Sequence, residues 1–333
     1  MTIDNSKEHI SRRDFLKIIA IAGMALGVGL KIRRNLLADG FSHLSETRFL
    51  MGTVVNLTVI SQDGRENQAA VRNTFNEMQR WIEMFDHRNP NSLISKLNHN
   101  GVLHTPQPEI SGVFEKAINY AELTNGAFDI TIKPVLDAYH RGLPITPELR
   151  SLVDYRQIKL SEDHIYLSRS GGEVTLDGIA KGAVIDAGVA TLVSHGYDNV
   201  FVEAGGDLMA HGNRGGNIPW RIGIKHPRKK EDAFLTHFDL HNFAVATSGD
   251  YQFSFNTDFS SHHILNPLTG DSPPELASVT VLAPSTLDAD ALSTAVMVLG
   301  LDSGLDLINR LDGIETFVVT KEIETYTSEG FPT

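Results

Sequence analysis

The stretch HHILNPLTG places two adjacent histidines, His262 and His263, before an Asn-Pro-x-x-Gly turn. An imidazole with an ordinary pKa near 6.5 can accept a proton from a hydroxyl group that lies within hydrogen-bond reach. A turn histidine with a structural hydrogen bond is the alternative, because the chain has 14 histidines and most of them must have ordinary roles. The pair is therefore a candidate for general-base chemistry that needs support from other residues.

A second candidate is the segment LDADALSTAVMVLG, residues 287–300, in which Asp290 and Thr294 are four residues apart. On a helix this spacing places both side chains on one face. Both offer the oxygen ligands that Mg²⁺ takes together with waters and phosphates. The alternative is that Asp288 or Asp290 only caps the helix while Thr294 packs. Taken alone, the segment does not decide between these interpretations.

Three glycine-containing segments complete the set: TLDGIAKG (175–182), EAGGD (203–207) and ATSGDY (246–251). Glycines let a backbone approach a phosphate or a ring closely, although most glycine turns are only turns. The first segment is neither a P-loop nor a dinucleotide-binding fingerprint. It does predict a strand, a glycine and then a helix, so the first helical amides can hold an anion and Lys181 can add positive charge. A solvated helix lysine is the alternative for Lys181.

Composition excludes several classes of function. The chain has 333 residues, of which 41% are hydrophobic and 21% are charged, as in an ordinary globular protein. It has no cysteine, which excludes a thiol nucleophile, a thiolate metal site and a lipid-modified cysteine. The net charge is −12, and residues 1–38 contribute +4, so the remainder carries about −16. Such an acidic body without a basic patch is not expected to bind nucleic acid.

The N-terminal segment 1–38 has the pattern of a twin-arginine export signal. Arg12 and Arg13 precede an apolar run, residues 18–30, that is shorter than the roughly 20 residues of a membrane-spanning helix but fits a signal-peptide core. A buried N-terminal helix is the alternative, and three glycines in the run argue against it. We expect export to the periplasm or the outer face of the cytoplasmic membrane, with the segment either removed near Ala38 or kept as a membrane tether.

Residues 39–333 are expected to form one α+β domain. Apolar spacing predicts helices at 66–85, 111–123, 178–196, 290–299 and 305–311, and a short helix within NPNSLISKLN. Alternating and β-branched segments predict strands at TRFLMGTVVNLTVI, NVFVEA, LMAHG, WRIGIKHP, FAVATSG, YQFSF, ASVTVLA and ETFVVT. A hairpin turn is expected at residues 170–172, and a break or bulge at Gly52 within the first strand. Helices mixed with hairpin-linked strands favour largely antiparallel sheets packed with helices.

Nine motifs in one order carry a family resemblance that covers nearly all of residues 39–333. They are FLMGTVVNL, NSLISKLN, TNGAFDIT, LDGIAKGAVID, EAGGDL, IGIKHP, AVATSGDY, SHHILNPLTG and ADALSTAVMVLG. In this set the chain closely resembles the ApbE family of FAD:protein FMN transferases. The resemblance implies a T-fold-like α+β fold. It also implies an enzyme that splits FAD with Mg²⁺, places the FMN half on a Thr or Ser hydroxyl of a target protein, and releases AMP.

The same resemblance assigns roles to residues. It implies that His263 is the catalytic residue. It implies that the side chains of Asp290 and Thr294, with a backbone carbonyl near Gly178 or Ala180, hold the metal. The first histidine of the pair is then structural or a secondary contact. For FAD it implies contacts from residues of the matched motifs, namely Met51, Ala127, Phe128, Asp129, Lys181, Thr247, Ser248, Gly249 and Ile264.

With His263 as the base, the target hydroxyl would lose its proton as it attacks the FMN phosphorus, and such help contributes roughly 10²–10⁴-fold in rate. Mg²⁺ would offset the phosphate charge and stabilise AMP as it leaves. The chain also departs from the family pattern: Thr175 replaces a common acidic residue, Asp177 appears two places later, Asn266 replaces a common Asp, and Arg88 replaces an aromatic residue of some members.

Two other functions are compatible with these residues. A metal-dependent FAD pyrophosphatase would use the same flavin and Mg²⁺ sites with water as the acceptor. An exported flavin-binding carrier would hold FAD without cleaving it, and because a carrier needs no metal at the pyrophosphate, Asp290 with Thr294 argues for an enzyme. As acceptors the resemblance implies exported domains of sodium-pumping quinone reductases and Rnf-type complexes, or secreted flavin reductases.

Overall fold

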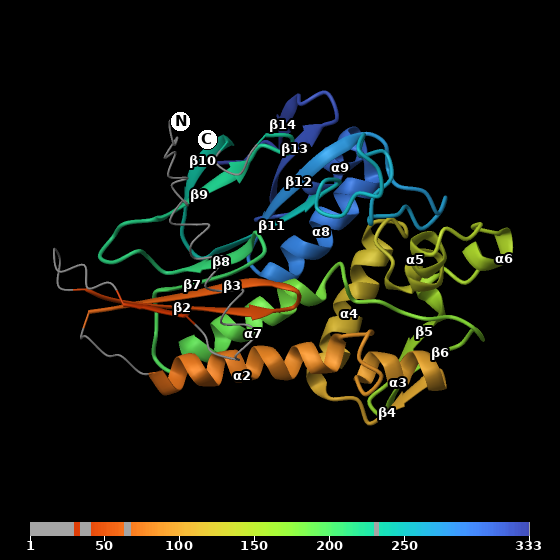
Figure 1. Ribbon diagram of the computed structural model, residues 1–333, viewed down its shortest axis with the longest axis horizontal. Helices are drawn as coiled ribbons and strands as arrows, with labels where there is room; N and C mark the ends of the chain where they lie inside the picture. The colour runs from red at the N-terminus through yellow and green to blue at the C-terminus, as the bar shows by residue number, and fades with distance from the viewer. Residues whose placement is uncertain (1–29, 34–40, 63–67, 230–232, 333) are drawn as a thin grey trace, which may run out of the picture.

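The computed structural model describes residues 30–33, 41–62, 68–229 and 233–332. Its centre is a nine-stranded sheet in the order β1-β2-β3-β7-β8-β11-β12-β13-β14, in which every pairing is antiparallel (Figure 1). A hairpin of β9 with β10 and a small sheet in the order β4-β6-β5 are also antiparallel. The predicted α+β class with largely antiparallel sheets is confirmed.

The bounds of the elements are as follows. The strands are β1 Leu30–Arg33, β2 Ser42–Leu50, β3 Thr53–Ser61, β4 Val102–His104, β5 Ile158–Leu160, β6 His164–Leu167, β7 Val200–Ala204, β8 Asp207–His211, β9 Trp220–Lys225, β10 Phe234–Leu240, β11 Phe243–Gly249, β12 Leu276–Ala283, β13 Glu315–Thr320 and β14 Thr325–Thr327. The helices are α2 Gln68–Phe85, α3 Leu93–Asn100, α4 Pro108–Leu123, α5 Lys133–His140, α6 Pro147–Arg150, α7 Ala180–Ser194, α8 Thr286–Leu299 and α9 Leu301–Ile308, with 3₁₀ turns η1 Ile130–Ile132 and η2 Tyr155–Gln157.

The large sheet is covered on both faces. Helices α7 and α8 pack on one face, and the β9–β10 hairpin packs on the other, so β12 is buried along its whole length. The neighbours Val281 and Leu282 of β12 point to opposite faces and belong to the two separate apolar clusters. A strand covered on both faces has a continuous apolar sequence, which explains the pattern LASVTVLA.

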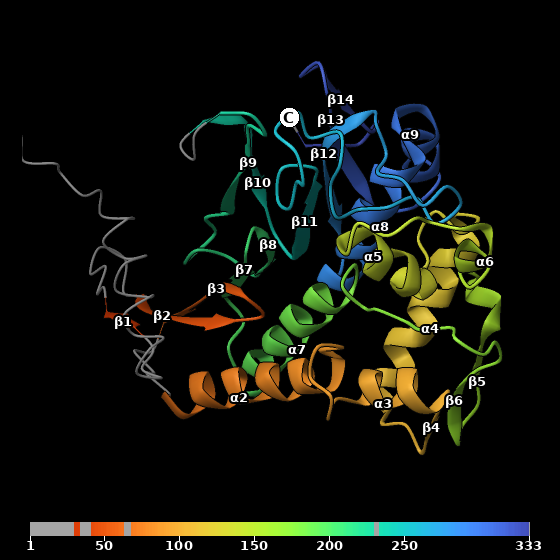
Figure 2. The same ribbon diagram turned by 45° about the vertical axis from the view of Figure 1, so that its right-hand side comes forward.

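Helix α7 lies between the sheet and α2 (Figure 2), which explains why its sequence is apolar on nearly all sides. Helix α2 is amphipathic, and its residues Val71, Phe75 and Met78 are buried against this layer. Helices α3 to α6 and the small sheet form a mainly helical part beside α8, seen on the right of both views. The site described below lies where this helical part meets the large sheet.

Several expected elements differ in the structure. The segment TRFLMGTVVNLTVI is not one strand with a bulge but most of a hairpin, because Met51 and Gly52 both have positive φ and form a two-residue turn. The hairpin expected at residues 170–172 is absent, and β5 pairs with β6 instead. YQFSF lies in an irregular loop, and the helix expected from Ser111 begins at Pro108.

Most of the predicted N-terminal segment 1–38, including its twin-arginine motif, lies outside the described residues. Its residues 30–33 form β1, which pairs with β2 in the register Leu30↔Thr47. Within the described ranges, no helix is both long enough and apolar enough to cross a membrane.

Candidate active site

A cavity of about 420 Å³ opens where α7, α8 and β11 meet two loops. One loop precedes α5 and the other, residues 250–275, connects β11 to β12. Most of the predicted site residues line this cavity: Ala127, Phe128, Asp129, Gly178, Lys181, Thr247, Ser248, His263, Ile264, Asp290 and Thr294.

Three predicted residues are not among those that line the cavity. Met51 lies in the turn between β2 and β3, where it packs against the main apolar cluster. Ala180 is the first residue of α7, and Gly249 is the last residue of β11. Ala180 and Gly249 are sequence neighbours of lining residues, whereas Met51 comes from a different edge of the sheet.

The first turns of α7 and α8 meet beside the cavity. The carboxylate of Asp186 on α7 holds the start of α8, because it accepts hydrogen bonds from the amides of Thr286 at 2.8 Å and Leu287 at 2.9 Å. Gly182 is required at the contact, because a Cβ there would lie 2.3 Å from the Thr286 carbonyl oxygen. The close approach of the helices brings Asp290 against α7, where its Oδ2 accepts the Gly182 amide at 3.0 Å.

Asp290 is not the cap of its helix. Ser285 caps α8 by accepting the Asp288 amide at 3.1 Å, and Asp288 itself accepts hydrogen bonds from Lys116 and Tyr120. The side chain of Asp290 is instead buried at the cavity wall with 5% of its surface exposed. Burial raises the pKa of this carboxyl, and the charge of Lys181 opposes the shift. The capping interpretation of Asp290 is therefore wrong.

Oxygen donors converge at this wall. Thr294 lies one turn after Asp290, and its Oγ1 lies 3.3 Å from Ser248 Oγ. The backbone of Gly178 passes close by, since a Cβ there would lie 3.4 Å from Thr294 Oγ1. Among the described residues there is no cluster of three or more His, Cys, Asp or Glu side chains that could hold a metal. One carboxylate, one hydroxyl and a nearby backbone fit Mg²⁺, which takes few protein ligands beside waters and phosphates.

Lys181 places a positive charge at the same wall of the cavity as Asp290. Its ammonium contacts Asp207 Oδ2, and Asp207, which is 1% exposed, also accepts the Thr247 amide at 3.0 Å. Burial alone would lower the pKa of Lys181, but the carboxylates of Asp207 and Asp290 outweigh burial and raise it. The lysine therefore stays charged at the cavity. The motif EAGGD contains Asp207, but nothing in the sequence indicates that this carboxylate pairs with Lys181.

His263 faces the cavity with one ring nitrogen already occupied. Its Nδ1 lies 3.3 Å from the carbonyl oxygen of Phe253, and its backbone amide donates to the same oxygen at 3.0 Å. A carbonyl oxygen can only accept, so this contact places the proton on Nδ1 and leaves Nε2 as an acceptor. Burial lowers the pKa of His263 to about 4, with a further contribution from Lys181. The imidazole is therefore neutral at pH 7, as a general base must be.

His262 points away from the cavity into the interior. It is fully buried, and its Nε2 lies 3.2 Å from the carbonyl oxygen of Pro273. Its backbone amide and carbonyl both bond the Ser272 hydroxyl, at 2.9 and 2.7 Å. These contacts fix the loop on either side of the turn, which agrees with a structural role for the first histidine.

Asp129 organises the opposite wall. Its Oδ1 accepts the amide and the hydroxyl of Thr131 at 2.8 and 2.7 Å, and its Oδ2 accepts the Tyr155 amide at 2.8 Å. Burial raises the pKa of this carboxyl. The carboxylate therefore caps the 3₁₀ turn η1 and holds Ala127 and Phe128, which precede it, at the cavity.

A charged group at the cavity rim involves two of the four departures from the family pattern, Arg88 and Asp177. Arg88 forms two hydrogen bonds to Asp177, at 3.0 and 3.3 Å, and His87 Nε2 lies 3.1 Å from the same carboxylate. Burial would raise the pKa of Asp177, but the His87 hydrogen bond and the Arg88 charge lower it. The pairing could not be read from the sequence, because 89 positions separate Arg88 from Asp177.

The comparisons with known proteins agree in one family. The model described as the ApbE family matches residues 51–318. The FAD:protein FMN transferase of Escherichia coli K12 is 30% identical over 220 residues, which span 61% of this chain and 62% of that protein. The FAD:protein FMN transferase of Treponema pallidum is 26% identical over 314 residues, which span 86% of this chain and 87% of that protein.

Solved structures give the same result. The flavin transferase ApbE from Vibrio cholerae superposes with a TM-score of 0.76 at 26% identity, covering 87% of this chain and 98% of that chain. The ApbE protein from Thermotoga maritima superposes with a TM-score of 0.78 at 29% identity, covering 86% of this chain and 97% of that chain. Because the family model spans most of the chain and the folds coincide, this chain belongs to the ApbE family of transferases.

Proposed function

We propose that this protein transfers the FMN half of FAD to a Thr or Ser hydroxyl of a target flavoprotein, with Mg²⁺, and releases AMP. One observation carries the proposal: a neutral His263 with a free Nε2 lines the same cavity as the oxygen donors Asp290 and Thr294 and the ammonium of Lys181. A base, hard-oxygen ligands and a positive charge are the groups that phosphoryl transfer from a pyrophosphate requires.

Asp290, Thr294 and the backbone near Gly178 are the residues that would hold Mg²⁺, and Ala180 follows in the same segment. The ion, when bound, offsets the charge of the two phosphates and of the leaving AMP. Lys181 binds the pyrophosphate through its charge, and Asp207 holds the ammonium at the cavity. The apolar surface formed by Phe128, Ile264 and neighbouring residues suits the flavin ring.

The chemical step needs one proton acceptor. The hydroxyl oxygen of the acceptor forms a bond to the FMN phosphorus while the bridging P–O bond breaks, and that electron pair leaves on AMP. Nε2 of His263 accepts the hydroxyl proton, and the Nδ1–H contact with Phe253 holds the ring in the required tautomer. General-base help of this kind contributes roughly 10²–10⁴-fold in rate.

We also propose an exported location, which the Arg12–Arg13 pair and the short apolar run support. The N-terminal segment is then either removed or kept as a membrane tether. The acceptors would be exported domains of quinone-reductase or Rnf-type complexes, or secreted flavin reductases. Fusing residues 1–38 to a reporter that is exported only when folded, with Arg12→Lys and Arg13→Lys as the control, tests the route. Export that persists in the control would contradict the twin-arginine route.

The test of the activity is the intact mass of a Thr-bearing acceptor domain after incubation with the full chain, FAD and Mg²⁺. A gain of one FMN, lost with a chelator and with His263→Ala but kept with the exposed-histidine control His241→Ala, is expected. Free FMN and AMP without a mass gain would replace the proposal with FAD pyrophosphatase activity. Bound FAD that stays intact with or without Mg²⁺ would replace it with a flavin carrier.

A further inference from the structure

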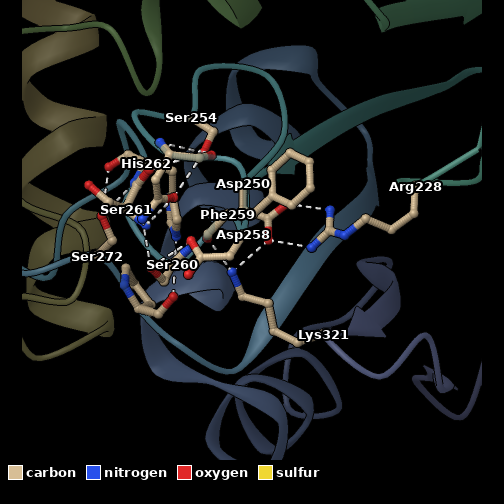
Figure 3. A network of polar contacts seen from close by, with 12 residues as sticks. Arg228, Asp250, Ser254, Asp258, Phe259, Ser260, Ser261, His262, Ser272 and Lys321 are labelled. Atoms are coloured by element: carbon tan, nitrogen blue, oxygen red, sulfur yellow. Dashed lines mark hydrogen bonds and ion pairs between the residues drawn. The ribbon is translucent and has the colours of Figure 1, made fainter.

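Two cations hold the loop after β11 at two points, its first residue Asp250 and Phe259 (Figure 3). Asp250, whose side chain is fully buried, accepts two hydrogen bonds from the Arg228 guanidinium at 2.7 Å each, and one from Lys321 Nζ at 2.6 Å. Lys321 Nζ also donates to the carbonyl oxygen of Phe259 at 2.6 Å. Lys321 therefore joins the first residue of the loop to a residue nine positions further along the chain.

Residues 253–263 of the loop fold into a small hairpin that has Phe259 near its tip. The amide of Phe255 donates to the carbonyl oxygen of Ser261 at 2.8 Å, and the amide of His263 donates to the carbonyl oxygen of Phe253 at 3.0 Å. Ser254 faces His262 as an isolated bridge between the two arms. The carbonyl of Phe253, which fixes the His263 tautomer, thus belongs to the arm that begins at Asp250.

Phe259 is held in a conformation that a bulky side chain rarely adopts. Its φ is +60°, in the left-handed region where a Cβ is strained. Two contacts hold Phe259 in this conformation. Its carbonyl oxygen accepts a hydrogen bond from the Lys321 ammonium, and the Arg228 guanidinium lies 4.2 Å from its ring centroid. The same two cations that meet at Asp250 therefore also hold the tip of the hairpin.

We propose that Arg228 and Lys321 are positioning residues for the catalytic step: by clamping Asp250 and Phe259 they fix the hairpin that aligns Phe253 with His263. The inference rests on the proposed role of His263 as the base. Asp250, Arg228 and Lys321 are not among the residues that line the cavity, so neither cation would contact the substrate, and their proposed effect on the reaction is exerted through the hairpin.

The charges around Asp250 make some substitutions more informative than others. Removing Asp250 would leave two partly buried cations without their carboxylate partner and would unfold the loop for reasons unrelated to His263. Removing Lys321 leaves Asp250 paired with Arg228 and releases only the tip. Lys321→Met is therefore the first variant to test and Arg228→Met the second. The matched controls are Lys225→Met and Arg221→Met, two exposed positions on β9.

The experiment reads the tautomer of His263 and the reaction rate in the same full-length proteins. Selective ¹⁵N-histidine labelling, with the His263 signal assigned from His263→Gln, reports which ring nitrogen carries the proton. In the unaltered chain and both controls we expect one tautomer, protonated at Nδ1. In Lys321→Met and Arg228→Met we expect mixed tautomers and a kcat for FMN transfer that falls up to about 100-fold with the KM for FAD unchanged, because small misplacements of a catalytic group have effects of that size.

Lys321→Arg keeps a cation with several donors and is expected to restore the single tautomer and the rate. If both methionine variants keep the tautomer and rate of their controls, the positioning role is wrong. If the unaltered chain neither transfers FMN nor releases AMP, the proposed function fails, and the tautomer measurement still decides whether the two cations position His263.

Discussion

The amide of Gly182 on α7 donates to Oδ2 of Asp290 on α8 at 3.0 Å, so one carboxylate joins the starts of two helices. Gly182 also lies close to the backbone of α8, since a Cβ on Gly182 would lie 2.3 Å from the Thr286 carbonyl oxygen. The position of the metal-binding oxygens proposed here thus depends on a glycine outside the cavity wall.

Gly182→Ala is expected to push α8 away from α7 and to cost about 1–3 kcal/mol of unfolding free energy, as overpacking does. The concentration of Mg²⁺ needed for half-maximal FMN transfer should rise with it. Urea unfolding and an Mg²⁺ titration measure the two effects. Gly112→Ala on α4, where a Cβ would meet nothing within 4 Å, is the control and should not destabilise the protein. Equal stability of the two variants would contradict the close contact.

Lys181→Met is expected to destabilise the protein by about 3–5 kcal/mol, because it leaves the buried carboxylate of Asp207 without its cation. Lys181→Met with Asp207→Asn removes that charge and keeps an acceptor for the Thr247 amide, so most of the stability should return. Affinity for FAD should stay low in both variants, since neither has the Lys181 ammonium that is proposed to bind the pyrophosphate. Urea unfolding and FAD fluorescence quenching separate the effects. A double variant as unstable as the single one would assign Lys181 a different structural role.

Thr294→Val is expected to raise the Mg²⁺ requirement of the reaction, while Thr294→Ser, which keeps the hydroxyl, should not. Treatment with a chelator should abolish FMN transfer by the unaltered chain, and added Mg²⁺ should restore it. The measurement is the rate of AMP release as a function of Mg²⁺ concentration. The ligand assignment is wrong if the valine and serine variants have the same Mg²⁺ dependence.

The pKa of His263, lowered by burial to about 4, predicts the pH dependence of catalysis. The base acts in its neutral form, so at saturating Mg²⁺ the rate should be level from about pH 8 to pH 5 and fall with a midpoint near pH 4. Between the folded pKa of about 4 and the unfolded value near 6.5, His263 binds more protons in the unfolded chain than in the folded one. The free energy of unfolding therefore rises with pH in this window and falls as the pH is lowered through it.

His263→Gln should therefore lose less stability than the unaltered chain as pH falls from 6.5 to 4. Urea unfolding of the two proteins at a series of pH values measures the difference. An acid limb centred near pH 6.5 would show that His263 is exposed to water rather than desolvated.

The sequence predicts most of the helices and central strands because their apolar spacing reflects burial directly, as in α2 and β12. The sequence does not show where an unusual backbone conformation determines the structure. Because Met51 adopts a positive φ, the segment predicted as one bulged strand forms a hairpin instead. Long-range polar pairs were also missed. Lys321 meets Asp250 across 71 positions, and neither residue lies in a pattern that indicates the other. Motif resemblance located the cavity residues, but the partners that hold them became visible only in three dimensions.

The loop hairpin carries His263, the proposed base, whereas the proposed metal ligands Asp290 and Thr294 lie on α8, which packs in the apolar core. Phe253 and Leu268, both in that loop, expose 71% and 72% of their surfaces and pack into no apolar cluster. If His263 is the base, substitutions there are expected to change which acceptor polypeptide the protein modifies and to leave the proposed metal and pyrophosphate site unaltered. We therefore expect that substitutions in the loop after β11 change the choice of acceptor, that substitutions on α8 change nucleotide binding, and that the two properties vary independently.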